Sequence, residues 1–322
     1  MDLAQAIVER VRRRRWGVAA AVVEGDETTV AFEDGDDAID ETSLFQVGSL
    51  TKTMTGVLLA DAIVRDETTA NATVGELLGV SGAAAAITLE QLVTQRSGLP
   101  RLPPNLDLDS IDRTNPYAAY FRTDLLAALE DVALQAGTYE YSNFGFMTLG
   151  QCLAASAQRP LEELFRDRIF EPLAMTTAGC PPSGSNRLLG YVGIEPRTWW
   201  DNPLPGSGGV GGTITDLAAY LRAHIDPPDN VTGQAIELAT TVHAGPPHTL
   251  GYGWMEREGG WWHNGAAGAF SAVIAFHRPA RVGLVVLANC DPDAASLDRP
   301  VLEALVEMVG VRASRATSWR RR

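Results

Sequence analysis

The chain has 322 residues, 45% of them hydrophobic, and a net charge of −14 at pH 7. This composition is that of a globular protein with a substantial core, and the acidic excess argues against binding to nucleic acid or anionic membranes. Its three cysteines, Cys152, Cys180 and Cys290, are spaced too widely for a zinc knuckle and are too few for a disulfide framework, so we expect buried free thiols and neither metal nor cofactor.

The N-terminal residues predict a helix and a strand rather than an export signal. Arginines at 12–15 precede an apolar run, 16–23, in a pattern that superficially resembles a signal peptide. That run has only eight residues, ends in the acidic turn 24–27 and lacks a small-residue cleavage site. Residues 2–14 carry apolar side chains at helical spacing, and 28–32 form the second strand of a hairpin. No stretch reaches the roughly 18 apolar residues of a membrane span, so a cytoplasmic protein is expected.

A helix that begins near Ser49 carries Lys52 in its first turn. Lys52 is the only lysine, since 25 of the 26 Lys and Arg residues are arginines. Residues three apart share a helix face, so the Lys52 amine can lie beside the Ser49 hydroxyl and help to remove its proton. Burial and the positive helix end both lower the pKa of a lysine. The alternative, a capping serine and a solvated lysine, places a cation against the helix dipole.

The middle of the chain, from about residue 67 to 204, has mainly helical patterns. They are interrupted by a proline-rich loop, 98–116, which is long enough to suggest a functional role. Tyr141-Ser142-Asn143 then lies in a turn before an apolar helix. A tyrosine beside a lysine can have its phenol pKa lowered and serve as general base and acid. The asparagine can hold a substrate carbonyl or orient the lysine.

The last third of the chain returns to strand patterns. His263-Asn264-Gly265 leads into an apolar strand, 269–277, and a second strand, 281–289, follows a short turn. A glycine at Gly265 permits close backbone approach to a ligand. An amphipathic helix, 297–309, comes next, and the arginine-rich end, 312–322, is better explained as a solvated, disordered tail than as a nucleic-acid arm.

Three other patterns suggest rival functions that their context disfavours. Residues 206–211 match the G-x-G-x-x-G dinucleotide pattern, but a proline-containing loop precedes them where a strand is required. Ser49 lacks the glycine that follows the nucleophile in an α/β-hydrolase elbow. His243 and His248 lie five apart in a proline-rich loop without metal-site spacing, so we interpret them as surface residues.

These elements predict an α+β fold in which an antiparallel sheet is flanked by N- and C-terminal helices. The sheet domain is discontinuous, comprising residues 1–66 and 205–322. Residues 67–204 form a mainly helical insertion domain. The active site is expected at the interface between the two domains.

The three motifs together resemble the serine β-lactamase and penicillin-binding protein family, in particular its class C β-lactamase-related branch of esterases, peptidases and amide hydrolases. The resemblance rests on Ser49-Leu50-Thr51-Lys52, Tyr141-Ser142-Asn143 and His263-Asn264-Gly265, which occur in the family's order. Further stretches look like family signatures: 92–100, 169–175, 208–220 and 251–254. The similarity extends from about residue 16 to 309, which is most of the chain.

The resemblance implies a catalytic mechanism through an acyl-enzyme. Ser49 would be the acylated nucleophile, and Lys52 and Tyr141 would share the proton transfers, with either one as the base. Water would then release the acyl group, activated by Tyr141.

The resemblance also implies the substrate contacts. Asn143 would contact the amide or ester, and His263 would line the opposite wall. The backbone N–H groups of Ser49 and Ala266, beside Gly265, would form an oxyanion hole. No cofactor or metal is implied.

His263 marks a departure from the family's efficient β-lactamases, which usually have a lysine there to hold the antibiotic's carboxylate. A mostly neutral imidazole gives up much of that charge-assisted hydrogen bond. We therefore expect a serine hydrolase that acts on a small ester or amide, and the alternatives are a true β-lactamase or a D,D- or D-amino peptidase. An acyltransferase and a slowly turning over penicillin-binding module stay open.

Two features have no decided role at the level of sequence. Gln95-Arg96 stands where relatives often have His-Thr, and we find no reason for the change. The pocket walls are expected from loops 101–116 and 190–205. Four aromatic residues in or near them either line the pocket or pack in the core: Tyr117, Tyr120, Trp199 and Trp200.

Overall fold

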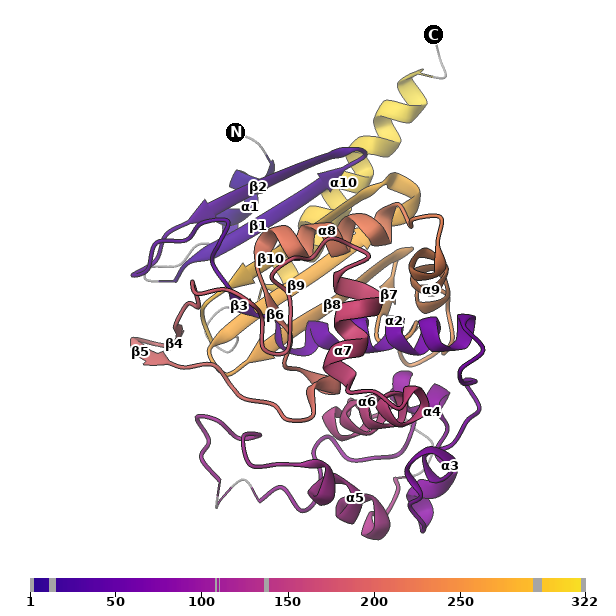
Figure 1. Ribbon diagram of the computed structural model, residues 1–322. Helices are drawn as coiled ribbons and strands as arrows, with labels where there is room; N and C mark the ends of the chain where they lie inside the picture. The colour runs from indigo at the N-terminus through magenta and orange to yellow at the C-terminus, as the bar shows by residue number, and fades with distance from the viewer. Residues whose placement is uncertain are drawn as a thin grey trace.

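A computed structural model describes residues 3–11, 16–107, 109, 111–135, 139–291 and 297–319, with side chains described as far as Gly310. A six-stranded sheet has the strand order β2-β1-β10-β9-β8-β7, and every neighbouring pair is antiparallel (Figure 1). The strands are β1 (Val18–Glu24), β2 (Glu27–Glu33), β7 (Met255–Arg257), β8 (Gly260–Ala267), β9 (Phe270–His277) and β10 (Val282–Ala288). Pairing of β1 with β10 brings the two ends of the chain together.

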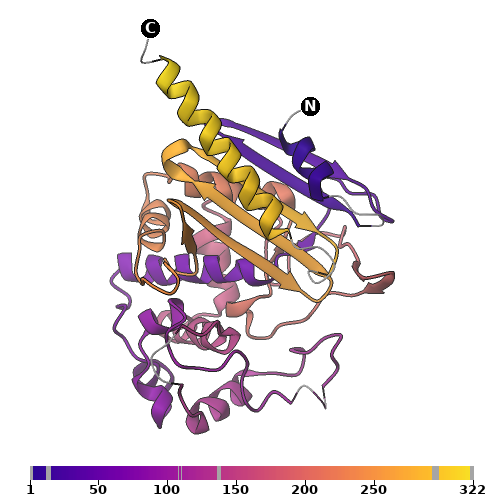
Figure 2. The ribbon, with the colours of Figure 1, turned by 180° about the vertical axis from the view of Figure 1, so that it is seen from behind.

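Helices cover both faces of this sheet, which explains why β10 is apolar along its whole length. Helices α1 (Leu3–Val11) and α10 (Asp298–Trp319) lie across one face (Figure 2). Helix α8 (Ile214–Ile225) packs on the other. Alternate residues of β1 accordingly enter two separate apolar clusters, one on each side of the sheet.

Helix α2 (Thr51–Val64) lies between the sheet and the helices in the lower part of Figure 1. The other helices are α3 (Val74–Leu78), α4 (Leu89–Val93), α5 (Arg122–Asp131), α6 (Asn143–Ala157), α7 (Leu161–Phe165) and α9 (Val231–Ala239). Short turns are η1 (Gly48–Leu50), η2 (Ala83–Ala86), η3 (Arg166–Phe170), η4 (Pro205–Ser207) and η5 (Arg278–Ala280). Two small strand pairs are β3 (Phe45–Gln46) with β6 (Gly211–Gly212) and β4 (Gly190–Val192) with β5 (Glu195–Arg197).

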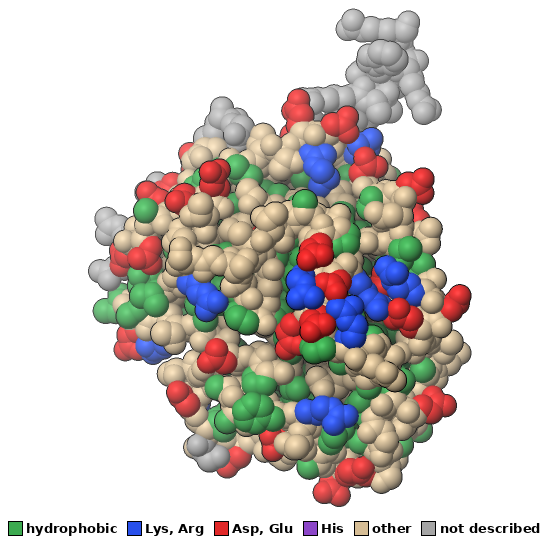
Figure 3. Space-filling view, viewed as in Figure 1, with side chains coloured by type: hydrophobic (Ala, Val, Ile, Leu, Met, Phe, Trp, Pro, Cys, Tyr) green, Lys and Arg blue, Asp and Glu red, His purple; other side chains and the backbone are tan. Residues whose placement is uncertain are grey.

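Arginines pair with the abundant carboxylates over the surface. Figure 3 shows basic and acidic side chains interspersed on one face. Arg168 pairs with Asp61 at 3.0 Å and with Glu67 at 2.7 Å, and so ties η3 to the end of α2. Because Asp61 is buried, salt screens this network less than it screens an exposed ion pair.

The predicted α+β fold is confirmed, with an antiparallel sheet and terminal helices on one of its faces. The last helix ends at Trp319 instead of 309, so the expected disordered tail is helical as far as that residue. Residues 12–15 and 320–322 lie outside the described part of the chain. The division into a sheet domain and a helical domain stays a prediction; the segment 67–204 also contains the β4–β5 pair.

The burial of the cysteines and the hydropathy of the helices were also expected from the sequence. Cys152 and Cys290 are buried and Cys180 is partly buried, which agrees with the expected burial for the first two. Within the described ranges, no helix combines the length and the apolar character needed to span a bilayer.

Candidate active site

Ser49 lies in turn η1, which continues directly into α2, so its side chain stands at the helix entrance. Nζ of Lys52 lies 2.9 Å from Oγ of Ser49, as the three-residue spacing predicts. Lys52 is fully buried, with 0% of its surface exposed. The alternative of a solvated first-turn lysine is therefore wrong.

The Lys52 amine is held by oxygens from three parts of the chain. Nζ contacts Oγ of Ser49, Oδ1 of Asn143 at 2.8 Å and the carbonyl oxygen of Ser207 at 2.7 Å. Ser207 belongs to the glycine-rich segment 206–211, whose role in the structure is thus to bring a carbonyl to the lysine. Burial, and then the charge of Arg101, hold the pKa of Lys52 well below its usual range.

The three oxygens match a neutral amine. The carbonyl of Ser207 and the amide oxygen of Asn143 can only accept hydrogen bonds, and they use the two N–H groups of such an amine. Its lone pair then points to the Ser49 hydroxyl, which can donate. An ammonium would also fit the three oxygens, but no carboxylate of the described residues forms an ion pair with Lys52 to offset a buried charge. The geometry therefore suits a base for Ser49.

Tyr141 completes the arrangement from the turn before α6. Tyr141 lines the same cavity as Ser49, and its ring centre lies 4.9 Å from Nζ of Lys52. Burial raises the pKa of Tyr141 to about 12 and outweighs the opposing effects of the nearby Ser49 hydroxyl and Arg101. The expectation of a lowered phenol pKa is therefore wrong. Tyr141 is a neutral phenol at pH 7, suited to donate a proton.

Gln95 fixes the turn that carries Tyr141, a role that the sequence did not reveal. Its carbonyl oxygen accepts a hydrogen bond from the N–H of Glu140 at 2.9 Å, and its Oε1 accepts one from the N–H of Ser142 at 2.8 Å. The two bonds bracket Tyr141 on either side. Gln95 is 6% exposed and adopts the left-handed backbone region, with φ of 58°, which lets both groups face the same turn. The side-chain hydrogen bond to Ser142 thus gives a structural reason for the glutamine at position 95, which the sequence alone did not explain.

Strand β8 lies against turn η1 in direct backbone contact. A Cβ on Gly265 would overlap the carbonyl oxygen of Val47, and a Cβ on Gly48 would lie 2.6 Å from the backbone nitrogen of Ala266. The close approach at Gly265 is made by the turn that carries Ser49. Gly265 also lines the larger cavity beside Ser49, and its approach to a ligand stays a prediction. Ala266 lines the cavities beside Ser49. An oxyanion hole formed by the Ser49 and Ala266 N–H groups stays a prediction that this contact supports.

His263 lies behind Tyr141, with 3% of its surface exposed and its ring centre 6.3 Å from the tyrosine ring. Its Nδ1 lies 2.5 Å from the carbonyl oxygen of Asn264, which indicates that the proton is on Nδ1. Burial, and then the nearby Lys52, lower the pKa of His263 to about 3, so the ring is neutral. His263 does not line the cavities beside Ser49 where a wall residue was expected.

Two cavities meet at Ser49. The larger, of about 460 Å³, extends between β8 and the start of α10 and is lined by residues that include Arg101, Tyr141 and Asp298. The narrower one, of about 50 Å³, includes Tyr117 and Trp200 in its walls. Of the four aromatic residues in question, these two line the site.

The other two aromatic residues pack in the interior. Tyr120 is 5% exposed and donates a hydrogen bond to Asn105 at 2.8 Å. Trp199 packs edge-on against Phe270, with 5.6 Å between the ring centres. Loop residues thus contribute both to the cavity walls and to the core.

A family model described as Beta-lactamase matches residues 3–307. The chain belongs to the β-lactamase family. Since this match covers nearly the whole chain, the family resemblance of the three motifs is confirmed. Membership supports a serine hydrolase, in agreement with the serine, lysine and tyrosine assembled at the entrance of α2.

This β-lactamase-family chain is similar to proteins with different names. It is 25% identical over 247 residues to a D-aminopeptidase of Cereibacter sphaeroides (strain KD131 / KCTC 12085), a match that covers 72% of this chain and 48% of the relative. It is 26% identical over 309 residues to penicillin-binding protein 4 of Amycolatopsis lactamdurans, covering 85% and 80%. It is 24% identical over 280 residues to protein flp of Staphylococcus aureus (strain N315), covering 78% and 54%. The chain thus spans about half the length of the first and third of these relatives.

The two loop histidines of this β-lactamase-family chain have different surroundings. Nδ1 of His243 lies 3.5 Å from Oε1 of Glu90, and its ring stacks on Tyr252, so the interpretation of His243 as a surface residue is wrong. His248 is exposed beside Tyr139. Over the described ranges, no group of three or more His, Cys, Asp or Glu side chains could hold a metal ion.

Proposed function

We propose that the chain is a serine hydrolase that cleaves a small ester or amide through an acyl-enzyme on Ser49. The observation that carries the proposal is the contact of a fully buried lysine, without a carboxylate partner among the described residues, with the Ser49 hydroxyl at 2.9 Å. A buried amine with a lowered pKa is available in its neutral form to accept a proton, and this amine already contacts the hydroxyl that it must deprotonate. Family membership is consistent with this role.

In the proposed acylation, Lys52 takes the Ser49 proton as Oγ attacks the substrate carbonyl. The N–H groups of Ser49 and Ala266 stabilise the negative oxygen of the tetrahedral intermediate. Tyr141 donates its proton to the leaving group as the carbonyl–leaving-group bond breaks, and it regains a proton from Lys52. Both groups then return to their starting protonation states.

Deacylation uses the same groups in the reverse sense. Water attacks the acyl carbonyl while its proton passes to the Tyr141–Lys52 pair. The bond to Oγ of Ser49 breaks, and the proton returns to that oxygen, which restores the free enzyme. Oδ1 of Asn143 keeps Lys52 in place, 2.8 Å from Nζ, throughout.

A peptidase acting on D-amino substrates is the second candidate, because three curated relatives are named D-aminopeptidase. A β-lactamase is less well supported, since the buried and neutral His263 offers no cation to an antibiotic's carboxylate.

The test is p-nitrophenyl ester hydrolysis by the wild type and Ser49→Ala, together with mass spectrometry after treatment with a fluorophosphonate. We expect Ser49→Ala to lower kcat/KM by about 10³-fold or more and to abolish the covalent adduct. Ser156→Ala, at the far end of α6, is the matched control and should keep both the wild-type kcat/KM and the covalent adduct. A Ser49→Ala enzyme with the wild-type rate would show that the proposal is wrong.

A further inference from the structure

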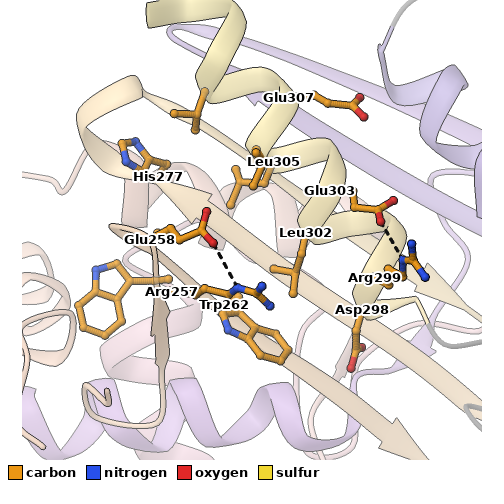
Figure 4. A pocket seen from close by; sticks show the side chains of 14 residues that line it. Arg257, Glu258, Trp262, His277, Asp298, Arg299, Leu302, Glu303, Leu305 and Glu307 are labelled. Carbon is orange, nitrogen blue, oxygen red and sulfur yellow. Dashed lines mark hydrogen bonds and ion pairs between the residues drawn. The ribbon is translucent and has the colours of Figure 1, made fainter. Parts of the chain in front are cut away.

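The cavity of about 460 Å³ beside Ser49 contains a carboxylate that the proposed mechanism does not use. Asp298, the first residue of α10, lines this cavity together with Ser49 and Tyr141. It also lines an apolar groove of about 800 Å³ between α10 and the β7–β8 hairpin. Figure 4 shows Asp298 pointing away from the Arg299–Glu303 ion pair of that groove. Asp298 therefore lies where the groove and the active-site cavity meet.

The charge of Asp298 is unmatched within the described part of the chain. Its Oδ2 accepts one hydrogen bond, from Nδ2 of Asn264 at 2.7 Å, and no described arginine, lysine or histidine forms an ion pair with it. The adjacent Arg299 pairs with Glu303 at 2.8 Å instead. Burial raises the pKa of Asp298, and the Asn264 hydrogen bond only partly opposes this effect. A half-buried carboxylate without a cationic partner is stabilised when a ligand supplies a positive group.

Trp262 provides an apolar and aromatic wall next to this carboxylate. It is half-buried on β8 and lines both the cavity and the groove with Asp298 (Figure 4). An ammonium group is held well by a carboxylate oxygen together with the face of an indole ring. A neutral hydroxyl could donate a hydrogen bond to the free oxygen of Asp298 but would not balance its charge. An aliphatic group would leave that oxygen without a partner.

We propose that Asp298 and Trp262 form a subsite for an ammonium group of the substrate, so that the preferred substrates are amine-bearing esters or amides. The inference rests on the proposed hydrolase function of Ser49. Asp298 acts on specificity and takes no part in the proton transfers.

Arg101 provides a contrast within the same cavity. Its guanidinium lies 5.2 Å from the centre of the Tyr141 ring, so the cavity holds one cation and one carboxylate from separate elements. With the carboxylate of Asp298 neutralised, Arg101 would be the remaining charged side chain among the described residues that line it. Loss of the negative charge of Asp298 should therefore weaken the binding of cationic substrates in this cavity.

The test compares three p-nitrophenyl esters of matched length: the 6-aminohexanoate, the neutral heptanoate and the pimelate monoester. We expect the wild type to favour the ammonium ester over the neutral one by about ten-fold or more in kcat/KM, mainly through KM. Asp298→Asn keeps an oxygen acceptor for Asn264 but removes the charge. It should abolish the preference, improve the pimelate ester relative to the ammonium ester, and leave the heptanoate rate within about two-fold.

Asp298→Glu is the second variant, because it retains the charge on the first turn of α10 and should retain part of the ammonium preference. Thermal melts of both variants show whether α10 is still docked. Equal losses on all three esters in Asp298→Asn would assign Asp298 a purely structural role and overturn the subsite. So would a wild type that hydrolyses the heptanoate ester without favouring the ammonium ester. If instead no ester is cleaved and the fluorophosphonate leaves Ser49 unlabelled, the hydrolase proposal itself fails and the subsite fails with it.

Discussion

Gln95→Ala tests whether the position of Tyr141 depends on one amide side chain. The substitution removes the acceptor for the N–H of Ser142, which lies 2.8 Å from Oε1 in the wild type. Because Gln95 and Ser142 are both buried, the unpaired N–H should lower the free energy of unfolding by about 1–3 kcal/mol. The bond from Glu140 to the main-chain carbonyl of Gln95 remains, so the turn loosens on one side only.

The larger effect is expected on catalysis. A displacement of a catalytic group by about 1 Å can reduce the rate about 100-fold, so we expect kcat to fall by roughly 10- to 100-fold with little change in KM. Urea unfolding gives the stability change, and steady-state kinetics with a neutral p-nitrophenyl ester separate kcat from KM. Gln95→Glu keeps an oxygen acceptor and should recover most of kcat.

Gln91→Ala, on the helix α4 that precedes Gln95, is the matched control. The Oε1 of Gln91 accepts a hydrogen bond from the N–H of Thr88 at 2.9 Å, on the exposed N-terminal turn of α4. This variant should lose stability by about 1 kcal/mol while kcat stays unchanged. If Gln95→Ala behaves in the same way, losing stability but not kcat, the positioning role assigned to Gln95 is refuted.

Two further predictions concern the base. Lys52→Arg keeps a cation that essentially cannot be deprotonated, so ester hydrolysis should fall by about 10²- to 10⁴-fold; an active arginine enzyme would contradict general-base catalysis at this position. Arg101→Gln should move the acidic limb of the pH profile of kcat/KM to higher pH. Lys52 must be neutral to act as a base, so activity falls as the pH drops through the pKa of Lys52. Burial is the larger cause that lowers this pKa, and the charge of Arg101 lowers it further. Removing Arg101 should therefore raise the pKa of Lys52. The profile is measured from pH 5 to 10 beside the exposed control Arg122→Gln. A shift confined to the alkaline limb would mean that Lys52 acts as an ammonium.

The sequence by itself determined the features that depend on local periodicity. The i, i+3 spacing placed Lys52 beside Ser49, because residues three apart on a helix are neighbours in any fold. Continuous apolar runs predicted the strands that became β9 and β10, since only strands covered on both faces are apolar throughout. The motifs also indicated the family, and the whole-chain match confirms it.

The tertiary structure decided the electrostatics and the partners of these residues. The sequence places Tyr141 near a lysine. Only the packing shows that burial outweighs the effects of Ser49 and Arg101, which lower the pKa of Tyr141, and raises that pKa to about 12. Burial depends on contacts between segments far apart in the chain, which periodicity does not encode. For the same reason the roles of Gln95, 46 positions before Tyr141, and of the carbonyl of Ser207 beside Lys52 emerged only when the chain was folded.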